Sequence, residues 1–218
     1  ELIDYSVDQY ALFYEFIFGN ADINFNVVRH IDRRQPVTAM NTSTSELTAI
    51  FLPLNQVGFG SQFALGDLLI KSEIAYKVFS SATLNNFAPL NQLDHLQVAL
   101  GVENTLYHPN NLESTFLIEF QTIEAVTKTE RATLGLFQQD LFFGYRLNFN
   151  NTQSTEFFAS MILDTERYYE ILFNMSISSK IFDRIIADFG IVKCMAKPQG
   201  DGLGLLNLSN LDHTFFKL

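Results

Sequence analysis

The chain has 218 residues, among them 22 Phe and 8 Tyr but no Trp, and only 17% of its residues are charged, where about 25% is usual in soluble domains. A net charge of −10 without any basic cluster excludes a nucleic-acid surface. The single Cys194 excludes an internal disulfide framework and a cysteine-based zinc site.

In chain order, the sequence predicts eleven strands in which apolar and polar residues alternate. The predicted strands are Asp8–Phe18, Ala21–Ile31, Gln56–Leu65, Leu68–Phe79, Asp94–Tyr107, Ser114–Glu124, Asp140–Phe149, Thr155–Leu163, Arg167–Ile177, Phe182–Lys193 and Leu211–Leu218. Their length of about ten residues is that of a tilted transmembrane strand, whereas soluble strands average about five or six. The lengths therefore favour strands that cross a membrane.

The predicted connections alternate between short and long, and only Asp164–Glu166 breaks the order. Outer-membrane β-barrels have this asymmetry, with tight turns on the periplasmic side and longer loops outside. Such barrels have an even number of strands, so the odd count predicts at least one further strand before Glu1. The alternative is that the stretch "ELIDYSV", residues 1–7, is itself a strand. The predicted long segments are Asp32–Asn55, Ser80–Leu93, Ala125–Gln139 and Cys194–Asn210.

One face of each predicted strand is nearly free of charge. In Leu68–Phe79, Ile74 and Tyr76 share a face, whereas Lys71 and Glu73 lie on the other. A soluble β-sandwich also hides an apolar face, but it does not account for so many Phe and Tyr residues on ten-residue strands or for the loop asymmetry. The sequence therefore predicts an all-β fold in which residues 1–218 form one domain. The predicted fold is an antiparallel up-and-down transmembrane β-barrel of about 11 or 12 strands, or part of a larger barrel.

The charged residues on the opposite face are predicted to line the interior of the barrel. These residues are Glu15, Lys71, Glu73, Lys77, Glu103, Glu119, Arg146, Glu156, Glu170, Arg184 and Asp188. Their acidic excess would favour cations in a pore. The alternative is that they pair across strands and fill the interior, with Arg146 beside Glu156 and Arg184 beside Glu170.

No motif in the sequence indicates catalysis. The chain contains no Gly-x-Ser-x-Gly sequence and no Asp-rich calcium loop, and its 4 histidines are dispersed. The sequence therefore predicts no enzyme, no metal site and no cofactor.

The stretch "GYRLNFNNTQSTEFFASMILD" carries a motif of Gly, Arg-Leu, a turn and Gln-Ser-Thr-Glu that ends in Asp. Its residues are Gly144, Arg146, Leu147, Asn150, Asn151, Gln153, Ser154, Thr155, Glu156 and Asp164. This motif resembles the C-terminal hairpin of functionally unassigned, porin-like outer-membrane β-barrel proteins of proteobacteria. The resemblance implies a barrel in a Gram-negative outer membrane but no activity. The ending "HTFFKL" departs from the group, whose barrels usually finish on an aromatic residue.

These observations predict a porin-like passive channel for small polar solutes, with outer-membrane lipid as its partner. A second interpretation is a structural scaffold or anchor that binds other membrane or envelope proteins through Asp32–Asn55 or Ala125–Gln139. A third is a soluble β-sandwich that acts as a binding module. Nucleic acid is not an expected partner under any of them.

Overall fold

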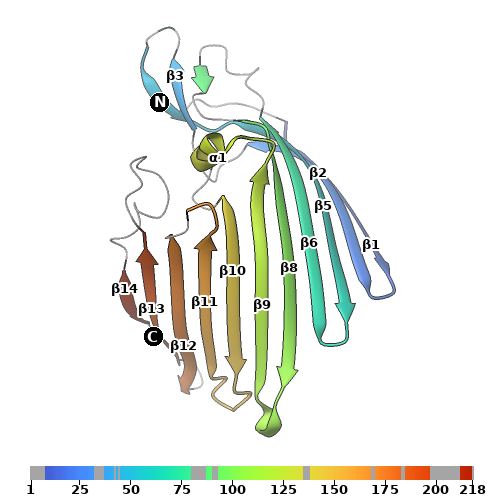
Figure 1. The fold of residues 1–218 in the computed structure, drawn as a ribbon, viewed down its shortest axis with the longest axis vertical. Coiled ribbons are helices and arrows are strands. Elements are labelled where there is room, and N and C mark those ends of the chain that lie inside the picture. The colour runs from blue at the N-terminus through green and yellow to red at the C-terminus, as the bar shows by residue number, and fades with distance from the viewer. Residues whose placement is uncertain are drawn as a thin grey trace. The chain divides into compact units, whose positions relative to one another are not determined.

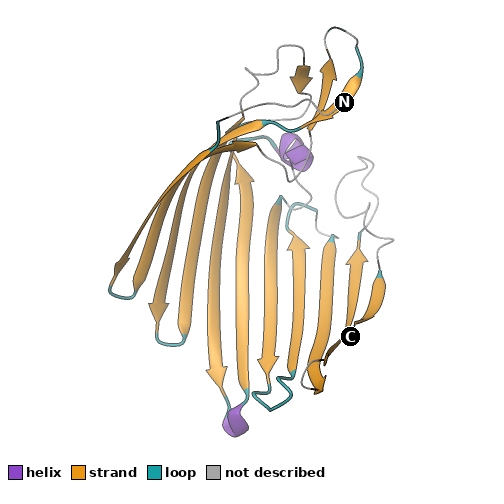
Figure 2. Cartoon of the chain, turned by 180° about the vertical axis from the view of Figure 1, so that it is seen from behind, coloured by secondary structure: helices purple, strands orange, loops and turns teal. Residues whose placement is uncertain are grey.

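The fold is all-β, as the alternation predicted. The computed structural model describes residues 8–31, 37–41, 43, 45–79, 87–89, 93–134, 138–167, 170–182, 185–196 and 212–217. Strands are connected by turns, one 3₁₀ turn (Pro109–Asn111) and one short helix, α1 (Lys128–Leu134), as Figures 1 and 2 show. No helix in the described part of the chain is long and apolar enough to cross a membrane.

One antiparallel sheet contains 11 strands, hydrogen-bonded in the order β1-β2-β5-β6-β8-β9-β10-β11-β12-β13-β14. Each strand therefore lies beside its neighbours in the sequence, apart from inserted elements, which is the up-and-down topology that was predicted. The strands are β1 (Tyr10–Phe18), β2 (Ala21–Ile31), β5 (Pro53–Leu65), β6 (Leu68–Phe79), β8 (His95–Tyr107), β9 (Glu113–Glu124), β10 (Gln139–Asn148), β11 (Glu156–Asp164), β12 (Ile171–Phe182), β13 (Ile185–Met195) and β14 (His213–Lys217).

The predicted turn at Ser178–Ile181 is wrong. β12 begins later than predicted, at Ile171, and continues through these residues to Phe182. Ser178 and Lys180 pair with residues of β13 instead of forming a turn. Small and polar residues usually indicate a turn, but here the side chains of Ser178 and Lys180 occupy the polar face of the sheet, where such residues are expected.

Three of the predicted long segments contain regular structure. Three short strands, β3 (Val37–Asn41), β4 (Leu47–Ile50) and β7 (Phe87–Pro89), form a separate sheet in the order β4-β3-β7. Helix α1 follows Thr127, whose backbone N–H and hydroxyl both donate to Glu130 Oε2 at 2.8 Å, as in a capping box. These hydrogen bonds lower the pKa of Glu130.

The chain divides into two compact units. The described residues of Glu1–Gln62, Ser72–Val98 and Ile123–Gly135 form unit 1, and those of Phe63–Lys71, Ala99–Thr122 and Leu136–Leu218 form unit 2. β5, β6, β8 and β9 contribute residues to both units.

Burial in this protein is the reverse of that in a soluble domain. Among the described residues, the buried apolar side chains larger than alanine are Leu52, Pro53, Leu54, Ile123 and Cys194, whereas Asp140, Asp164 and Glu170 are at most 1% exposed. A soluble chain of this size hides most of its large aliphatic and aromatic residues. The apolar side chains of this sheet thus have no protein core to occupy in the described part of the chain.

Candidate functional site: the two faces of the sheet

The strand register sorts β10 to β13 into two faces. Asp140 lies opposite Asp164, Phe142 opposite Ile162, and the pairing continues without a shift along β10 and β11. Because side chains alternate along a strand, even-numbered residues of β10 to β13 share one face and odd-numbered residues share the other. We call these the polar face and the apolar face.

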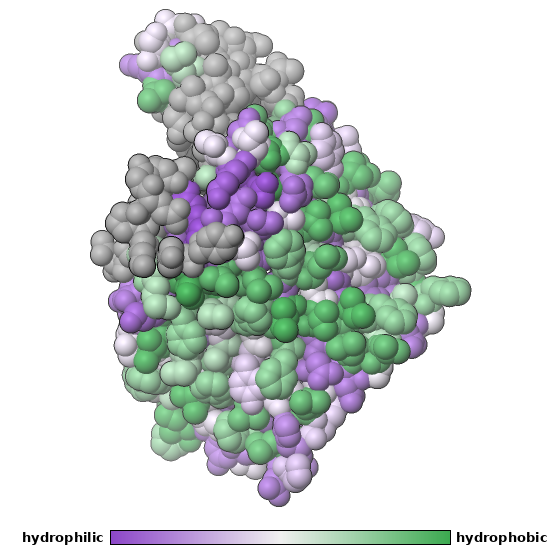
Figure 3. Space-filling view, viewed as in Figure 1, coloured by the Kyte–Doolittle hydropathy of each residue, from purple (hydrophilic) through white to green (hydrophobic). Residues whose placement is uncertain are grey.

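The apolar face of β10 to β13 carries a single charged residue, Lys193. In rows across these strands it holds Leu141, Leu163, Ile171 and Met195; Phe143, Met161, Phe173 and Lys193; Tyr145, Ala159, Met175 and Ile191; and Leu147, Phe157, Ile177 and Phe189. The ring of Tyr145 lies 4.8 Å from that of Phe116 and 6.3 Å from that of Phe157. Apolar residues cover much of the face drawn in Figure 3.

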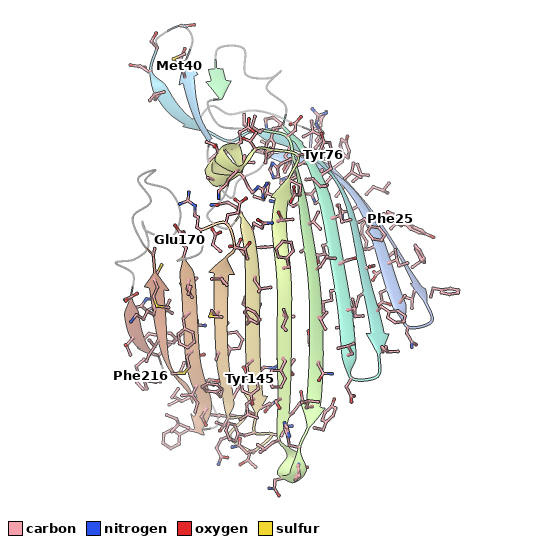
Figure 4. All side chains as sticks on the ribbon, in the orientation of Figure 1. Phe25, Met40, Tyr76, Tyr145, Glu170 and Phe216 are labelled. Carbon is pink, nitrogen blue, oxygen red and sulfur yellow. The ribbon has the colours of Figure 1, made fainter. Side chains whose placement is uncertain are left out.

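Large apolar side chains on this face remain open to solvent. Phe116 is 45% exposed, Ile118 48% and Phe189 47%. Figure 4 shows Tyr145 and Phe216 among the side chains of unit 2. A contiguous apolar surface of this kind indicates contact with another apolar phase or partner.

In unit 1, β1 exposes apolar side chains on both of its faces, with Phe13 59% and Ile17 74% exposed on the face of Glu15. Tyr14 lies opposite Phe25, and the Phe25 ring lies 6.5 Å from that of Phe16 and 5.1 Å from that of Phe59. The charged exception, Arg29, is close to the end of β2. Tyr14 is 63% exposed.

Strand residues predicted to line the interior lie on the polar face, and some of them interact. Lys71 Nζ lies 2.7 Å from Glu103 Oε2, an ion pair between β6 and β8. Lys77 Nζ donates to Gln97 Oε1 at 2.7 Å. These contacts resemble the side-chain pairing that was the alternative to an open, charged interior.

Glu119 on β9 lies opposite Phe142 and close to Gly101. Glu15 lies opposite Asn24 across the β1–β2 hairpin. Glu73 shares the polar face of β6 with Lys71, and its side chain is exposed.

The predicted ion pair between Arg146 and Glu156 is absent from the described structure. Arg146 lies opposite Phe158, whereas Glu156 lies opposite Asn148, so the two charges are diagonal neighbours and not direct partners. Asp188 is the remaining predicted lining residue on a described strand. In the strand register it lies opposite Ser178 of β12 and Lys217 of β14.

Glu170 lies in the turn before β12 and not within a strand, contrary to the prediction. Its Oε1 lies 3.2 Å from Arg167 Nη1, and their side chains are 0% and 5% exposed respectively. Its predicted partner, Arg184, lies outside the described residues. Figure 4 shows Glu170 at the end of the strands of unit 2 that is opposite to Tyr145.

The residues Asp164 to Arg167 after β11 are held by backbone and side-chain hydrogen bonds. Asp164 Oδ1 accepts from the backbone N–H groups of Glu166 and Arg167, both at 2.8 Å. The Thr165 N–H and hydroxyl donate to the Gln139 carbonyl at 2.8 and 2.7 Å. The Asp164 side chain therefore organises the turn, and Thr165 fastens it to β10.

Asp140 and Asp164 form the centre of a buried acidic cluster, which we define as Asp140, Asp164, Arg167 and Glu170. Asp140 Oδ2 accepts from Gln121 Nε2 at 3.4 Å. Asp140 Oδ1 and Asp164 Oδ2 are buried, and neither has a hydrogen-bond partner among the described residues. Residues directly opposite each other in antiparallel strands have Cβ atoms about 5 Å apart, so these two carboxyl groups are close neighbours.

The surroundings of the cluster disfavour ionisation. Burial, followed by the charge of Asp164, raises the pKa of the Asp140 carboxyl to about 7. Burial also raises the pKa of Asp164, although hydrogen bonds from the amides of Arg167 and Glu166 act in the opposite direction. No group of three or more His, Cys, Asp or Glu side chains that could hold a metal ion occurs within the described residues.

Sequence reasoning did not predict this cluster. It treated Asp164 as the end of a motif and Asp140 as the start of a strand. The sequence did contain a signal for this meeting of Asp140 with Asp164. The two residues are equally far from the middle of the turn between β10 and β11, and residues equally far from the middle of a hairpin turn lie opposite each other.

The polar face also carries one apolar row. Phe142, Ile162, Leu172 and Cys194 are direct cross-strand partners on β10 to β13, next to the acidic cluster. Part of the polar face is therefore suited to packing against side chains and not to contact with water.

The chain was compared with known protein families, curated proteins and solved structures. No protein-family model, curated protein or solved structure matches the chain.

Proposed function

We propose that the 11-stranded sheet forms the wall of a transmembrane β-barrel in a bacterial outer membrane. The observation that carries this proposal is the mismatch between the apolar face and the core. Phe, Tyr, Ile and Leu side chains remain exposed on long strands, whereas few apolar side chains of the described part, among them Leu52, Leu54 and Ile123, are buried. Lipid would cover such a face at no cost in unpaired polar groups.

The strand length supports this proposal. The 12 residues of β9 rise about 41 Å, which is about 31 Å along the axis of a barrel whose strands tilt by about 40°. This exceeds the apolar band of about 25 Å on outer-membrane barrels, so the ends of the strands extend outside that band. In the β10–β11 hairpin the outward apolar residues run from Leu141 to Leu147 and from Phe157 to Leu163. Asp140 and Asp164 lie beyond that membrane-spanning part, next to the polar pair Gln139 and Thr122.

A soluble β-sandwich fits these observations less well. A sandwich needs a second sheet of similar size that covers the apolar face. The second sheet among the described residues has only three short strands.

Closure of the barrel requires one more strand. With 11 strands in an antiparallel sheet, β1 and β14 run in the same direction and cannot pair antiparallel with each other. An unpaired edge is not tolerated in lipid, because each unsatisfied backbone group costs several kcal/mol. A closed antiparallel barrel therefore needs a further partner strand between β1 and β14.

Within this barrel we propose a passive channel for small polar solutes. The polar face supplies its lining, and Glu73, Glu119 and Arg146 are the charges that would contact permeating ions. In a planar lipid bilayer, Glu119→Gln should lower the preference for cations, and Glu130→Gln on α1 is the matched control. Equal selectivity of the wild type and both folded variants would count against the channel.

A second candidate function, a structural scaffold, has its own support. The segments predicted as docking regions contain β3, β4 and α1, which are regular elements outside the 11-stranded sheet. The apolar row on the polar face also favours a filled interior. Replacing Val37–Ile50 by a short Gly-Ser linker should release a copurifying partner without unfolding the barrel. A protein that copurifies with nothing would weaken this candidate.

The membrane proposal itself is tested by electrophoresis of the detergent-refolded chain, boiled and unboiled, with far-UV circular dichroism as the control for strand content. A β-rich species whose mobility changes only on boiling is expected. A chain that folds without detergent and shows no such change would overturn the proposal.

A further inference from the structure

The buried carboxyl groups of Asp140 and Asp164 receive little compensation for their charge. Each has one oxygen without a hydrogen-bond partner in the described part of the chain. The positive charge of Arg167 favours ionisation of Asp164, but burial acts in the opposite direction and raises the pKa of that carboxyl, and the guanidinium lies 3.2 Å from Glu170. Gln121 contributes only a neutral donor to Asp140.

The charged neighbours from other parts of unit 2 increase this imbalance. Glu166 and Glu170 act on Asp140 from the turn, and both oppose its ionisation. β13 contributes the Cys194 thiol, which is itself buried beside Glu170 and Asp212. Ionisation of both of these neighbouring buried carboxyl groups is unfavourable, because their negative charges repel each other and neither is solvated. Protonation of one of the two removes this repulsion.

We propose that Asp140 and Asp164 hold one proton between them, and that this proton fastens the Asp164–Arg167 turn to the end of β10. The protonated carboxyl of Asp140 donates from Oδ1 to Asp164 Oδ2, so that both unpartnered oxygens gain a hydrogen bond. Asp164 Oδ1 continues to accept from the amides of Glu166 and Arg167. The pair is thus a pH-sensitive latch at one end of the β10–β11 hairpin.

The direction of the pH effect follows from the folded and unfolded pKa values of Asp140. The pKa is about 7 in the folded protein against an ordinary value of 3.8. The folded state therefore holds a proton that the unfolded state has lost between these two values, and stability falls as pH rises through this window. For a single group the folding equilibrium constant falls by up to about tenfold per pH unit.

The test compares the wild type with Asp140→Asn in the detergent-refolded full chain. Unfolding by urea is measured by circular dichroism between about pH 4 and pH 8. The side-chain amide introduced by Asp140→Asn can donate to Asp164 at every pH, so the variant should lose the pH-dependent component that the wild type shows in this window. Asp188→Asn, a polar-face substitution outside the cluster, is the control and should retain the wild-type profile.

A second measurement reports the proton directly. The infrared band of a protonated carboxyl group should be present in the wild type near pH 6, weaken near pH 9, and be absent from Asp140→Asn. If Asp140→Asn does not fold, Asp140→Ser serves instead, because its hydroxyl can also donate to Asp164 at every pH. A wild-type profile in either variant, or the absence of the carboxyl band from the wild type near pH 6, would overturn the proposal.

Discussion

Placing a lysine on each face of β11 distinguishes a lipid-covered sheet from a solvent-covered one. Ala159 lies near the middle of β11 on the apolar face, opposite Tyr145 and Met175. The next residue, Ser160, lies on the polar face opposite Gly144. Both side chains are small and half-buried, so replacement by lysine removes little packing from either site.

The expected cost of Ala159→Lys depends on what covers the apolar face. Lysine near the midplane of a lipid face costs about 2–4 kcal/mol, which is a decrease of about 30- to 700-fold in the folding equilibrium constant. In contact with water the same substitution should change the free energy of unfolding by less than about 0.5 kcal/mol. Ser160→Lys is expected to have a small effect in either environment.

The assay is urea unfolding of protein refolded into phospholipid vesicles, followed by circular dichroism and by mobility of unboiled samples. The difference between Ala159→Lys and Ser160→Lys removes effects common to any added lysine. Equal stability of the two variants, with both close to the wild type, would refute the assignment of the apolar face to lipid.

Two further predictions concern packing at Gly190 on the polar face and the buried ion pair between Arg167 and Glu170. Gly190→Val should destabilise the β13–β14 pair by about 1–3 kcal/mol in urea unfolding, because a Cβ atom at Gly190 would overlap the Phe215 ring; Gly101→Ala, whose added Cβ meets its nearest atom at an ordinary 3.6 Å, should be nearly neutral. Arg167→Met should cost about 3 kcal/mol or more, because it removes the guanidinium from beside the fully buried Glu170 carboxylate. Adding Glu170→Gln to that variant should restore part of the loss, and a double variant no more stable than Arg167→Met would contradict the role of this pair.

The strands were predictable because their signal is local. β2 and β6 have the predicted bounds, and alternation is regular through the middle of each strand. β12 was misplaced because polar residues at its end have two local interpretations, turn or polar face. Pairing of Ser178 with Asp188 on β13 decides between them, and that contact is not a property of either segment alone.

The residues predicted for the candidate site share a face, but their partners could not be predicted. Alternation places Lys71 and Glu103 on the polar face, and the register then brings them together at 2.7 Å. The same reasoning failed for Arg146 and Glu156. They were expected to lie directly opposite each other, but the register places Arg146 opposite Phe158 and Glu156 opposite Asn148. Facial assignment needs only the period of the strand, whereas an ion pair needs the register to within one residue.

The sequence by itself determined that the protein is all-β, where most strands run, and which side chains share a face, because a period of two is written directly into the order of residues. Only the tertiary structure decided the register of the strands, the elements within the long connections, and the meeting of Asp140 with Asp164 at the end of a hairpin. It also decided that these carboxyl groups are buried while the apolar face is not. Burial depends on what the rest of the chain leaves uncovered, and no local pattern contains that information.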